Sequence, residues 1–413
     1  MTEKFIPYCL PDITELEIKE VVETLQSGWL AKGPKTIEFE KKFAEFVGAK
    51  YAVAMNSCTA ALHIALVAAD IGPGDEVITT SMTFAASVST ILHVGAVPVF
   101  VDIDPKTGLM DVEKIEEKIT DRTKAIVPVH YAGQACDLDR IYGIAKKYNL
   151  FVSEDAAHGI YTEYKGKRLG NQALGTVSFS FYATKNLTTG EGGMLVTESK
   201  EIADRARVLI THGMNKNAWK RYAQGGSWMY DIQEPGYKYN MFDVQASLGL
   251  AQLERLGEMQ NNRESKAQIY IKGLSEVKGL ELQKVDGGTS KHAWHLFIIR
   301  VTEEFPMSRD ELIDYLAEKN IGTSVHFIPV HMMTAYREFG SQSFLPNTEK
   351  WFSEIMSLPL YSTLEIEDID RIVKTINQIP LRKPKDFAEE NLIRLISNSQ
   401  KGMATPPSPR DRM

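Results

Sequence analysis

The stretch LFVSEDAAHGIYTEYKGKRLGNQALGTVSFSFYATK, residues 150–185, decides the fold because it holds two buried-strand patterns that each lead to a polar residue. The run at 150–157 contains Asp155, and the run at 176–184 is followed by Lys185. Near-continuous apolar strands separated by helical stretches indicate a mostly parallel sheet covered on both faces, and so an α/β fold. Similar runs lie at 51–55, 76–80, 97–102, 124–131 and 193–198.

Helical patterns precede this sheet. Residues 12–27 repeat apolar side chains at helical spacing, with Asp12 or Thr14 as the N-cap and Gly28 at the end. Residues 36–48 predict a second helix.

Beyond about residue 252 the pattern changes. We expect a long helix over 253–274, strands over 292–301 and 321–330, and a helix over 308–320 with a capping-box start. We predict a large α/β domain over residues 1–255, a smaller α+β domain over 256–383 and a partly disordered tail over 384–413.

Composition excludes several classes of protein. The 413 residues carry 47 basic and 54 acidic side chains, a net charge of −7, which argues against a nucleic-acid partner or an anionic membrane surface. The start lacks a signal-peptide pattern, and no run is long enough to span a membrane. Cys9, Cys58 and Cys136 are too widely spaced for a zinc site or a disulfide framework. We therefore expect a cytoplasmic protein without a metal site.

Asp155 and Lys185 are the first candidates for chemistry, because ligands of open parallel sheets bind beyond the carboxyl ends of the strands. Taken alone, Asp155 fits a helix N-cap and Lys185 a surface lysine. The two lie 30 residues apart, about one strand–helix–strand excursion, so both can project from one edge of the sheet. Pyridoxal 5′-phosphate (PLP) needs such a pair, since its aldehyde joins a lysine amine and its protonated ring nitrogen pairs with a carboxylate.

PLP also needs a phosphate site, and NSCTAALHIAL (56–66) offers one at a helix start. Ser57 and Thr59 supply hydroxyls beside free backbone N–H groups, although a plain helix cap fits the same spacing. Ser180 shares a strand face with Ser178 and Tyr182 and adds a further hydroxyl. Phe84 fits either a ring stacked on the cofactor or a core aromatic.

The segments SEDAAHG, SFSFYATKNLTTGEGGM, NSCTAALH, GYKYNM and HAWHLFIIR resemble the DegT/StrS family of nucleotide-sugar aminotransferases, a branch of the fold-type I PLP enzymes. The resemblance runs from about residue 5 to 380. Several segments are similar to the branch that makes UDP-4-amino-4-deoxy-L-arabinose.

The resemblance implies specific roles. Lys185 would be the Schiff-base lysine, Asp155 the partner of the ring nitrogen, and His158 a side chain packed by the ring. Phosphate ligands would be Thr59, the Ala60 backbone, Ser180 and, from the neighbouring subunit of a homodimer with shared active sites, Asn240. Phe84 would stack on the ring where the L-arabinose branch has Trp, and Trp29 and His326 would line the sugar site.

The implied reaction moves an amino group from L-glutamate to a keto carbon of a nucleotide-linked sugar. The similarity to the L-arabinose branch implies that this carbon is C4. The products would serve lipopolysaccharide or another polysaccharide. The alternatives are a PLP-dependent sugar dehydratase or isomerase on the same scaffold and a non-enzymatic regulator. Some dehydratases of the family have His in place of the lysine, so Lys185 favours transamination.

Overall fold

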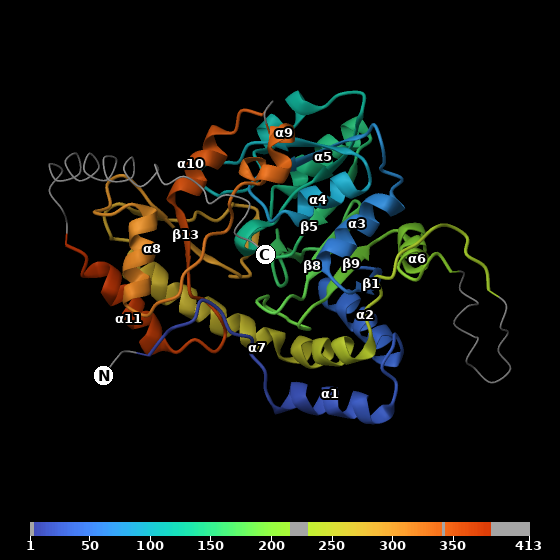
Figure 1. Ribbon diagram of the computed structural model, residues 1–413, viewed down its shortest axis with the longest axis horizontal. Helices are drawn as coiled ribbons and strands as arrows, with labels where there is room; N and C mark the ends of the chain where they lie inside the picture. Colours follow the sequence, from blue (N-terminus) through green and yellow to red (C-terminus); the bar gives the residue numbers. More distant parts are fainter. Residues whose placement is uncertain (1–3, 215–229, 341–342, 381–413) are drawn as a thin grey trace, which may run out of the picture.

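A central sheet with helices on both faces organises the computed structural model in Figure 1. The structure describes residues 4–214, 230–340 and 343–380. The seven-stranded sheet has the order β1-β9-β8-β5-β4-β2-β3. Its strands are β1 (Tyr51–Met55), β2 (Glu76–Thr80), β3 (Val97–Val101), β4 (Thr123–Val127), β5 (Phe151–Asp155), β8 (Thr176–Ser180) and β9 (Gly193–Thr197).

The predicted α/β class is confirmed, and each of the seven apolar runs forms one strand of this sheet. β9 is antiparallel to both of its neighbours, whereas the other pairs are parallel. The reason lies in residues 181–192, which contain no helix. A parallel return needs a longer crossover, usually helical, so this short loop brings the chain back antiparallel. Lys185 lies in that loop.

Each face of the sheet has its own layer of helices. Ala52 and Ala54 of β1 pack with Phe39 and Phe43 on one side, and Val53 packs on the other. This alternation is the expected period of a strand. The first side is covered by α2 (Pro34–Val47), α5 (Leu138–Tyr148) and the start of α7 (Asp243–Leu274), and the second by α3 (Cys58–Ala68), α4 (Ala86–His93) and α6 (Lys200–Leu209).

A smaller C-terminal part surrounds a second core that includes the end of α7. Its sheet has the order β10-β12-β13 and is antiparallel throughout. The proposed boundary at residue 255 falls inside α7, which runs through both parts (Figure 1). The elements are β10 (Leu280–Leu282), β12 (Phe297–Val301), β13 (Ile355–Leu358), α8 (Arg309–Glu318), α9 (Arg337–Gly340), α10 (Pro346–Glu354) and α11 (Ile366–Asn377).

Smaller elements complete the described chain. A separate three-stranded sheet is formed by β6 (Glu163–Tyr164), β7 (Lys167–Arg168) and β11 (Thr289–Lys291). Short 3-10 helices lie at Val112–Lys114, Glu116–Lys118, Tyr131–Gly133, Val330–Met332 and Thr334–Tyr336.

Two strand predictions need correction. The strand expected over 321–330 is wrong, because this segment makes only isolated bridges at Ile321 and Ser324. The strand expected over 292–301 begins only at Phe297, since Trp294 has a left-handed φ of 48°. Both irregular segments line the cavity described below. The predicted amphipathic stretch at 386–399 lies outside the described residues.

The N-terminal helix α1 (Glu15–Ser27) begins at the Thr14 cap and ends at Gly28, as predicted. Its apolar row, however, faces outward: Ile18, Val22 and Leu25 are 48%, 42% and 51% exposed. The side of α1 that packs on α7 buries Glu17 instead.

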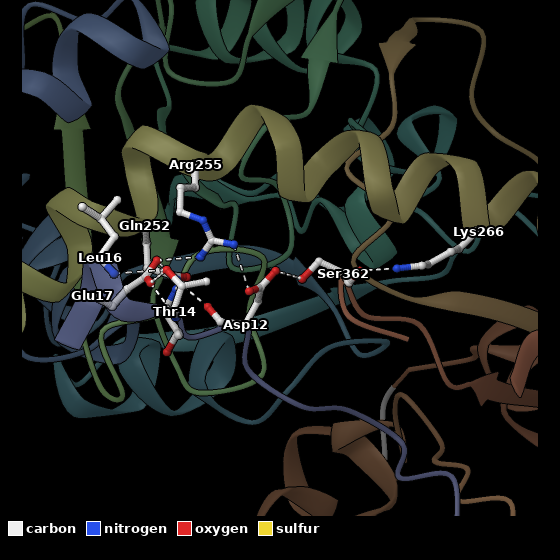
Figure 2. A network of polar contacts seen from close by, with 9 residues as sticks. Asp12, Thr14, Leu16, Glu17, Gln252, Arg255, Lys266 and Ser362 are labelled. Atoms are coloured by element: carbon white, nitrogen blue, oxygen red, sulfur yellow. Dashed lines mark hydrogen bonds and ion pairs between the residues drawn. The ribbon is translucent and has the colours of Figure 1, made fainter. Parts of the chain in front are cut away.

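Polar contacts hold this helix in place (Figure 2). Glu17 accepts from Arg255 of α7 at 2.8 Å, and Arg255 also donates to Asp12 at 3.0 Å. Asp12 accepts in turn from Ser362, beyond β13, at 2.7 Å. Lys266, further along α7, donates to the Ser362 carbonyl. The N-terminal segment therefore joins α7 to the smaller C-terminal part.

Candidate functional site

A cavity of about 480 Å³ opens where β5 and β8 of the large sheet end. Asp155 and Lys185 both line it, as the sequence predicted. Residues from distant segments of the chain also line the cavity. They include Tyr8, Cys9, Ser57, Thr59, Phe84, His158, Ser180, His295, His326 and Phe327. The position agrees with the rule that ligands of open α/β sheets bind beyond the strand ends.

Asp155 lies at the end of β5 and is buried. Its Oδ2 accepts a hydrogen bond from Ser87 Oγ at 2.6 Å, and its Oδ1 accepts one from the Ala157 N–H at 3.0 Å. Ser87 Oγ also lies 2.7 Å from Thr83 Oγ1. These bonds fix the orientation of the carboxylate, and each carboxylate oxygen has capacity for another donor.

Lys185 reaches the cavity from the loop between β8 and β9. Removal from bulk water lowers the pKa of Lys185 to about 8, although Cys58 and Asp155 act in the opposite direction. Its Nζ lies 3.4 Å from His295 Nε2. Near neutral pH, Lys185 is therefore more readily available than an ordinary lysine as the neutral amine, which is the form that attacks a carbonyl carbon.

The N-terminus of α3 faces the same cavity. Ser57 is the N-cap, and its Oγ accepts from the Ala60 N–H at 3.1 Å, so the cap reading of this motif is confirmed. Thr59 and Ser180 line the cavity beside it. A Cβ on Gly193 would lie 2.4 Å from the Ser57 carbonyl, so only glycine lets β9 approach this helix end. Backbone N–H groups, the helix dipole and two hydroxyls together suit a phosphate.

The rings of His158, His295, His326 and Phe327 form the other side of the cavity. His158 lies 4.3 Å from the His295 ring and stacks on Phe327 at 5.7 Å. Burial, with the charge of Lys185, lowers the pKa of His158 well below its usual range. Burial, with the charge of Lys185, also lowers the pKa of His326 to about 4. All of these imidazoles are therefore neutral at neutral pH, which keeps their faces suited to stacking against an aromatic ring.

Of the four other predicted site residues, two line the cavity and two do not. Phe84 and His326 line the cavity. Trp29 does not line it in its own chain; it is 54% exposed and its ring covers Gly33. Asn240 bridges to Met55 near the end of β1, outside this lining, and its Oδ1 accepts from Lys238 at 2.5 Å.

Sequence reasoning missed Ser87, Asn186 and His295. His295 is 110 residues from Lys185 in the chain, and no spacing rule connects them. Asn186 directly follows Lys185, and only the fold shows that its Oδ1 lies 3.0 Å from His295 Nδ1. Ser87 follows Phe84 by one helical turn, the one signal that could have drawn attention to it.

Three glutamines of α7 hold the lysine loop. Gln245 donates to the Glu191 carbonyl at 2.6 Å, and Gln252 accepts from the Thr188 N–H at 3.3 Å. Gln260 accepts from Asn186 Nδ2 at 3.4 Å. They lie seven and eight residues apart, two helical turns, so they share one face of the helix. The loop that carries Lys185 is thus fixed by the helix that runs through both parts of the molecule.

The donor set of this cavity fits PLP. A buried carboxylate, an amine of lowered pKa and an anion site at a helix N-terminus line one volume, and each answers a different part of the cofactor. Asp155 suits the ring nitrogen, Lys185 the aldehyde, and the start of α3 the phosphate.

The described residues contain no group of three or more His, Cys, Asp or Glu side chains placed to hold a metal ion. No helix in the described ranges combines the length and the apolar character that crossing a bilayer requires. Cys9, Cys58 and Cys136 are all free thiols.

Comparison with known proteins gives consistent results. The model of the DegT/DnrJ/EryC1/StrS aminotransferase family matches residues 11–377. The spore coat polysaccharide biosynthesis protein SpsC of Bacillus subtilis is 52% identical over 380 residues, covering 91% of this chain and 97% of that protein. UDP-4-amino-4-deoxy-L-arabinose–oxoglutarate aminotransferase of Shewanella sediminis is 43% identical, covering 92% and 99%.

Among solved structures, Spr1654 of Streptococcus pneumoniae, which is named as a sugar aminotransferase, matches in its PLP form. The TM-score is 0.83 and the identity 37%, over 90% of this chain and 98% of that one.

Proposed function

The chain belongs to the DegT/DnrJ/EryC1/StrS aminotransferase family, and from this membership we propose that it transfers the amino group of L-glutamate to a keto carbon, C4, of a nucleotide-linked sugar. The chain is a PLP-dependent sugar aminotransferase. We propose its amino donor, its sugar substrate and the roles of its residues.

One observation carries it. Lys185 and Asp155 line a single cavity together with the N-terminus of α3, although the three come from separate segments. When bound there, PLP supplies an aldehyde that takes up an amino group and a ring that stabilises negative charge on the adjacent carbon. A cavity holding all three of its anchoring groups is the arrangement that transamination requires.

Each residue has a defined task. Asp155 accepts a hydrogen bond from the ring nitrogen and keeps it protonated. Thr59, Ser180 and the Ala60 backbone hold the phosphate. For this, the Ala60 N–H exchanges its hydrogen bond to Ser57 Oγ for one to the phosphate. Lys185 would hold the cofactor covalently and, once the amino donor has displaced it, would take a proton from the donor Cα and deliver that proton to the cofactor carbon that carried the aldehyde. Its lowered pKa suits that base role.

His158, Phe84 and Phe327 supply flat apolar surfaces for the cofactor ring and exclude water from it. We assign the sugar side to His326, whose Nδ1 lies 2.9 Å from Ser357 Oγ, and to Trp29. Trp29 lies outside the cavity of its own chain, so in this proposal it serves a neighbouring subunit.

The names of the relatives support the substrates. One relative is named for spore coat polysaccharide biosynthesis, and another for a UDP-linked 4-amino sugar and oxoglutarate. Oxoglutarate is the keto acid that glutamate leaves behind. We therefore propose a product destined for a surface glycan, lipopolysaccharide among the possibilities, made in the cytoplasm.

A homodimer completes the proposal. Asn240 lies outside the cavity of its own chain and would reach the phosphate site of the partner. The outward apolar row of α1 supports a partner, because Ile18, Val22 and Leu25 would otherwise stay in water.

The test is a product assay. The protein is incubated with L-glutamate and a panel of keto-sugar nucleotides, and products are identified by mass spectrometry. We expect one 2-oxoglutarate for each amino sugar formed. A dehydrated sugar without stoichiometric 2-oxoglutarate would favour the dehydratase alternative. Lys185→Ala should lose turnover by several orders of magnitude and lose the visible absorbance of the lysine-bound cofactor; an active Lys185→Ala enzyme would end the assignment.

A further inference from the structure

Lys185 has a neighbour that the proposed function does not use. Its Nζ lies 3.4 Å from His295 Nε2, and His295 is buried in the irregular segment before β12. A neutral imidazole can present either a proton or a lone pair from Nε2, and the two choices have opposite effects on a lysine. The hydrogen bonds around His295 decide which one is present.

The backbone carbonyl of Ala293 can only accept hydrogen bonds. Asn186 Nδ2 lies 2.6 Å from the Ala293 carbonyl oxygen, so the amide nitrogen of Asn186 must face it. The amide oxygen of Asn186 therefore faces His295 Nδ1, at 3.0 Å. An amide oxygen accepts, so His295 Nδ1 carries the proton. Since burial, reinforced by the nearby His158 and Lys185, keeps this imidazole neutral, its Nε2 presents a lone pair to Lys185.

A second set of bonds holds Asn186 in this orientation. Gln260 Nε2 donates to the His292 carbonyl at 3.0 Å, which turns Gln260 Oε1 toward Asn186 Nδ2 at 3.4 Å. Both ends of the chain of bonds are thus backbone carbonyls, of Ala293 and His292. Every group between them has one consistent donor and acceptor assignment.

From this geometry we propose that His295 is a positioning residue for Lys185. Its Nε2 accepts a hydrogen bond from the lysine Nζ and holds the side chain at the cavity wall whenever the lysine is not attached to the cofactor. The inference rests on the proposed role of Lys185. The side chain of a free lysine rotates about four carbon–carbon bonds, so a fixed acceptor reduces the number of conformations that Lys185 samples. Asn186 acts through His295 by fixing its tautomer.

The first test determines the tautomer of His295 in the wild-type protein. Apoenzyme with ¹⁵N-labelled histidine should show the resonance of His295 with Nδ1 protonated and Nε2 bare at pH 7.5; its resonance is the one missing from a His295→Gln spectrum. A proton on Nε2 would overturn the proposal, because Lys185 would then face a donor.

The second test measures how fast the apoenzyme captures PLP covalently, by stopped-flow absorbance, which requires no substrate. His295→Phe removes the acceptor, and we expect capture and kcat each to fall about tenfold with the sugar KM unchanged, as for the loss of one hydrogen bond. Asn186→Leu should give a similar loss, and the double variant should be no worse than either. His295→Gln keeps a neutral acceptor of similar reach and should recover most of the rate.

His292→Phe is the matched control, because its ring lies in the same segment and does not contact Lys185: its Nδ1 accepts from the Trp294 N–H at 2.8 Å. It should capture PLP at the wild-type rate. Wild-type capture and kcat in His295→Phe would overturn this inference alone. Covalent capture by Lys185→Ala would instead overturn the proposed function.

Discussion

The orientation of Asp155 depends on Ser87 of α4. Asp155 lies at the end of β5, and the buried Ser87 hydroxyl donates a 2.6 Å hydrogen bond to its carboxylate. Hydrogen bonds to a charged group contribute about 1.5–3 kcal/mol in proteins. The position of Asp155, the proposed partner of the ring nitrogen, therefore depends on a residue that does not itself line the cavity.

We predict that Ser87→Ala lowers kcat by about tenfold, because Asp155 loses one charge-assisted hydrogen bond and its fixed orientation. The visible absorbance of the lysine-bound cofactor should remain, since Lys185 is untouched. Ser89→Ala is the control: its hydroxyl lies on the same helix and donates to the Ala85 carbonyl. Equal rates for Ser87→Ala and Ser89→Ala would contradict the prediction.

At the scale of elements, α2 starts without a cap of its own. Its N-cap is Gly33, and no side chain next to it in sequence satisfies the first N–H groups. Asp243, at the start of α7, does so from a distance: its carboxylate accepts from the N–H groups of Gly33, Lys35 and Thr36 at 2.7, 3.0 and 3.0 Å. One buried carboxylate thus joins the beginnings of two helices that cover the same sheet face.

We predict that Asp243→Ala lowers the free energy of unfolding by at least about 2 kcal/mol, because it leaves several N–H groups without an acceptor. Asp243→Asn, which keeps one acceptor oxygen, should lose less. Urea unfolding followed by circular dichroism measures both. A loss no larger for Asp243→Ala than for Asp243→Asn would show that the cap is not the source of stability.

The elements themselves were largely predictable. All seven strands of the large sheet were found, because a strand buried on both faces is marked by a continuous apolar run. The wrong strand at 321–330 has the same composition, but its backbone turns along the cavity and bonds to Ser357 and Ile6 at isolated positions. Composition records burial, and it does not distinguish a buried strand from a buried irregular segment.

At the scale of the whole molecule, Glu17 links pH to stability. Burial alone would raise the pKa of Glu17, but hydrogen bonds from Thr14, Arg255 and Gln252 outweigh it and lower the pKa to about 2 (Figure 2). A pKa lowered on folding contributes stability above the unfolded value, about 4.5, and that contribution is lost as the pH falls toward 2.

We predict that Glu17→Gln lowers the free energy of unfolding by about 2 kcal/mol at pH 7, because hydrogen bonds to the charged group weaken. The difference from wild type should shrink steadily between pH 4.5 and 2. Urea unfolding at a series of pH values measures it. A difference that is independent of pH over this window would mean that the charge of Glu17 contributes nothing.

The exposed apolar side chains of α1 lead to a prediction about the oligomeric state. Val22→Glu should convert a dimer into a monomer, measured by light scattering after gel filtration, because it places a charge in an apolar interface. Phe344→Glu is the control: Phe344 is 87% exposed, and the neighbouring α9 and α10 lie far from α1 (Figure 1). A wild-type monomer, or a Val22→Glu dimer of unchanged stability, would contradict the proposed interface.

The sequence by itself determined the sheet, the helices around it and the pair formed by Asp155 and Lys185, because periodicity and strand ends are local properties of the chain. Only the tertiary structure decided the rest of the cavity. Ser87 bonds to Asp155 across 68 residues of sequence, and His295 reaches Lys185 across 110 residues. A hydrogen bond needs two groups within about 3 Å, and between distant segments only the packing of the whole core sets that distance.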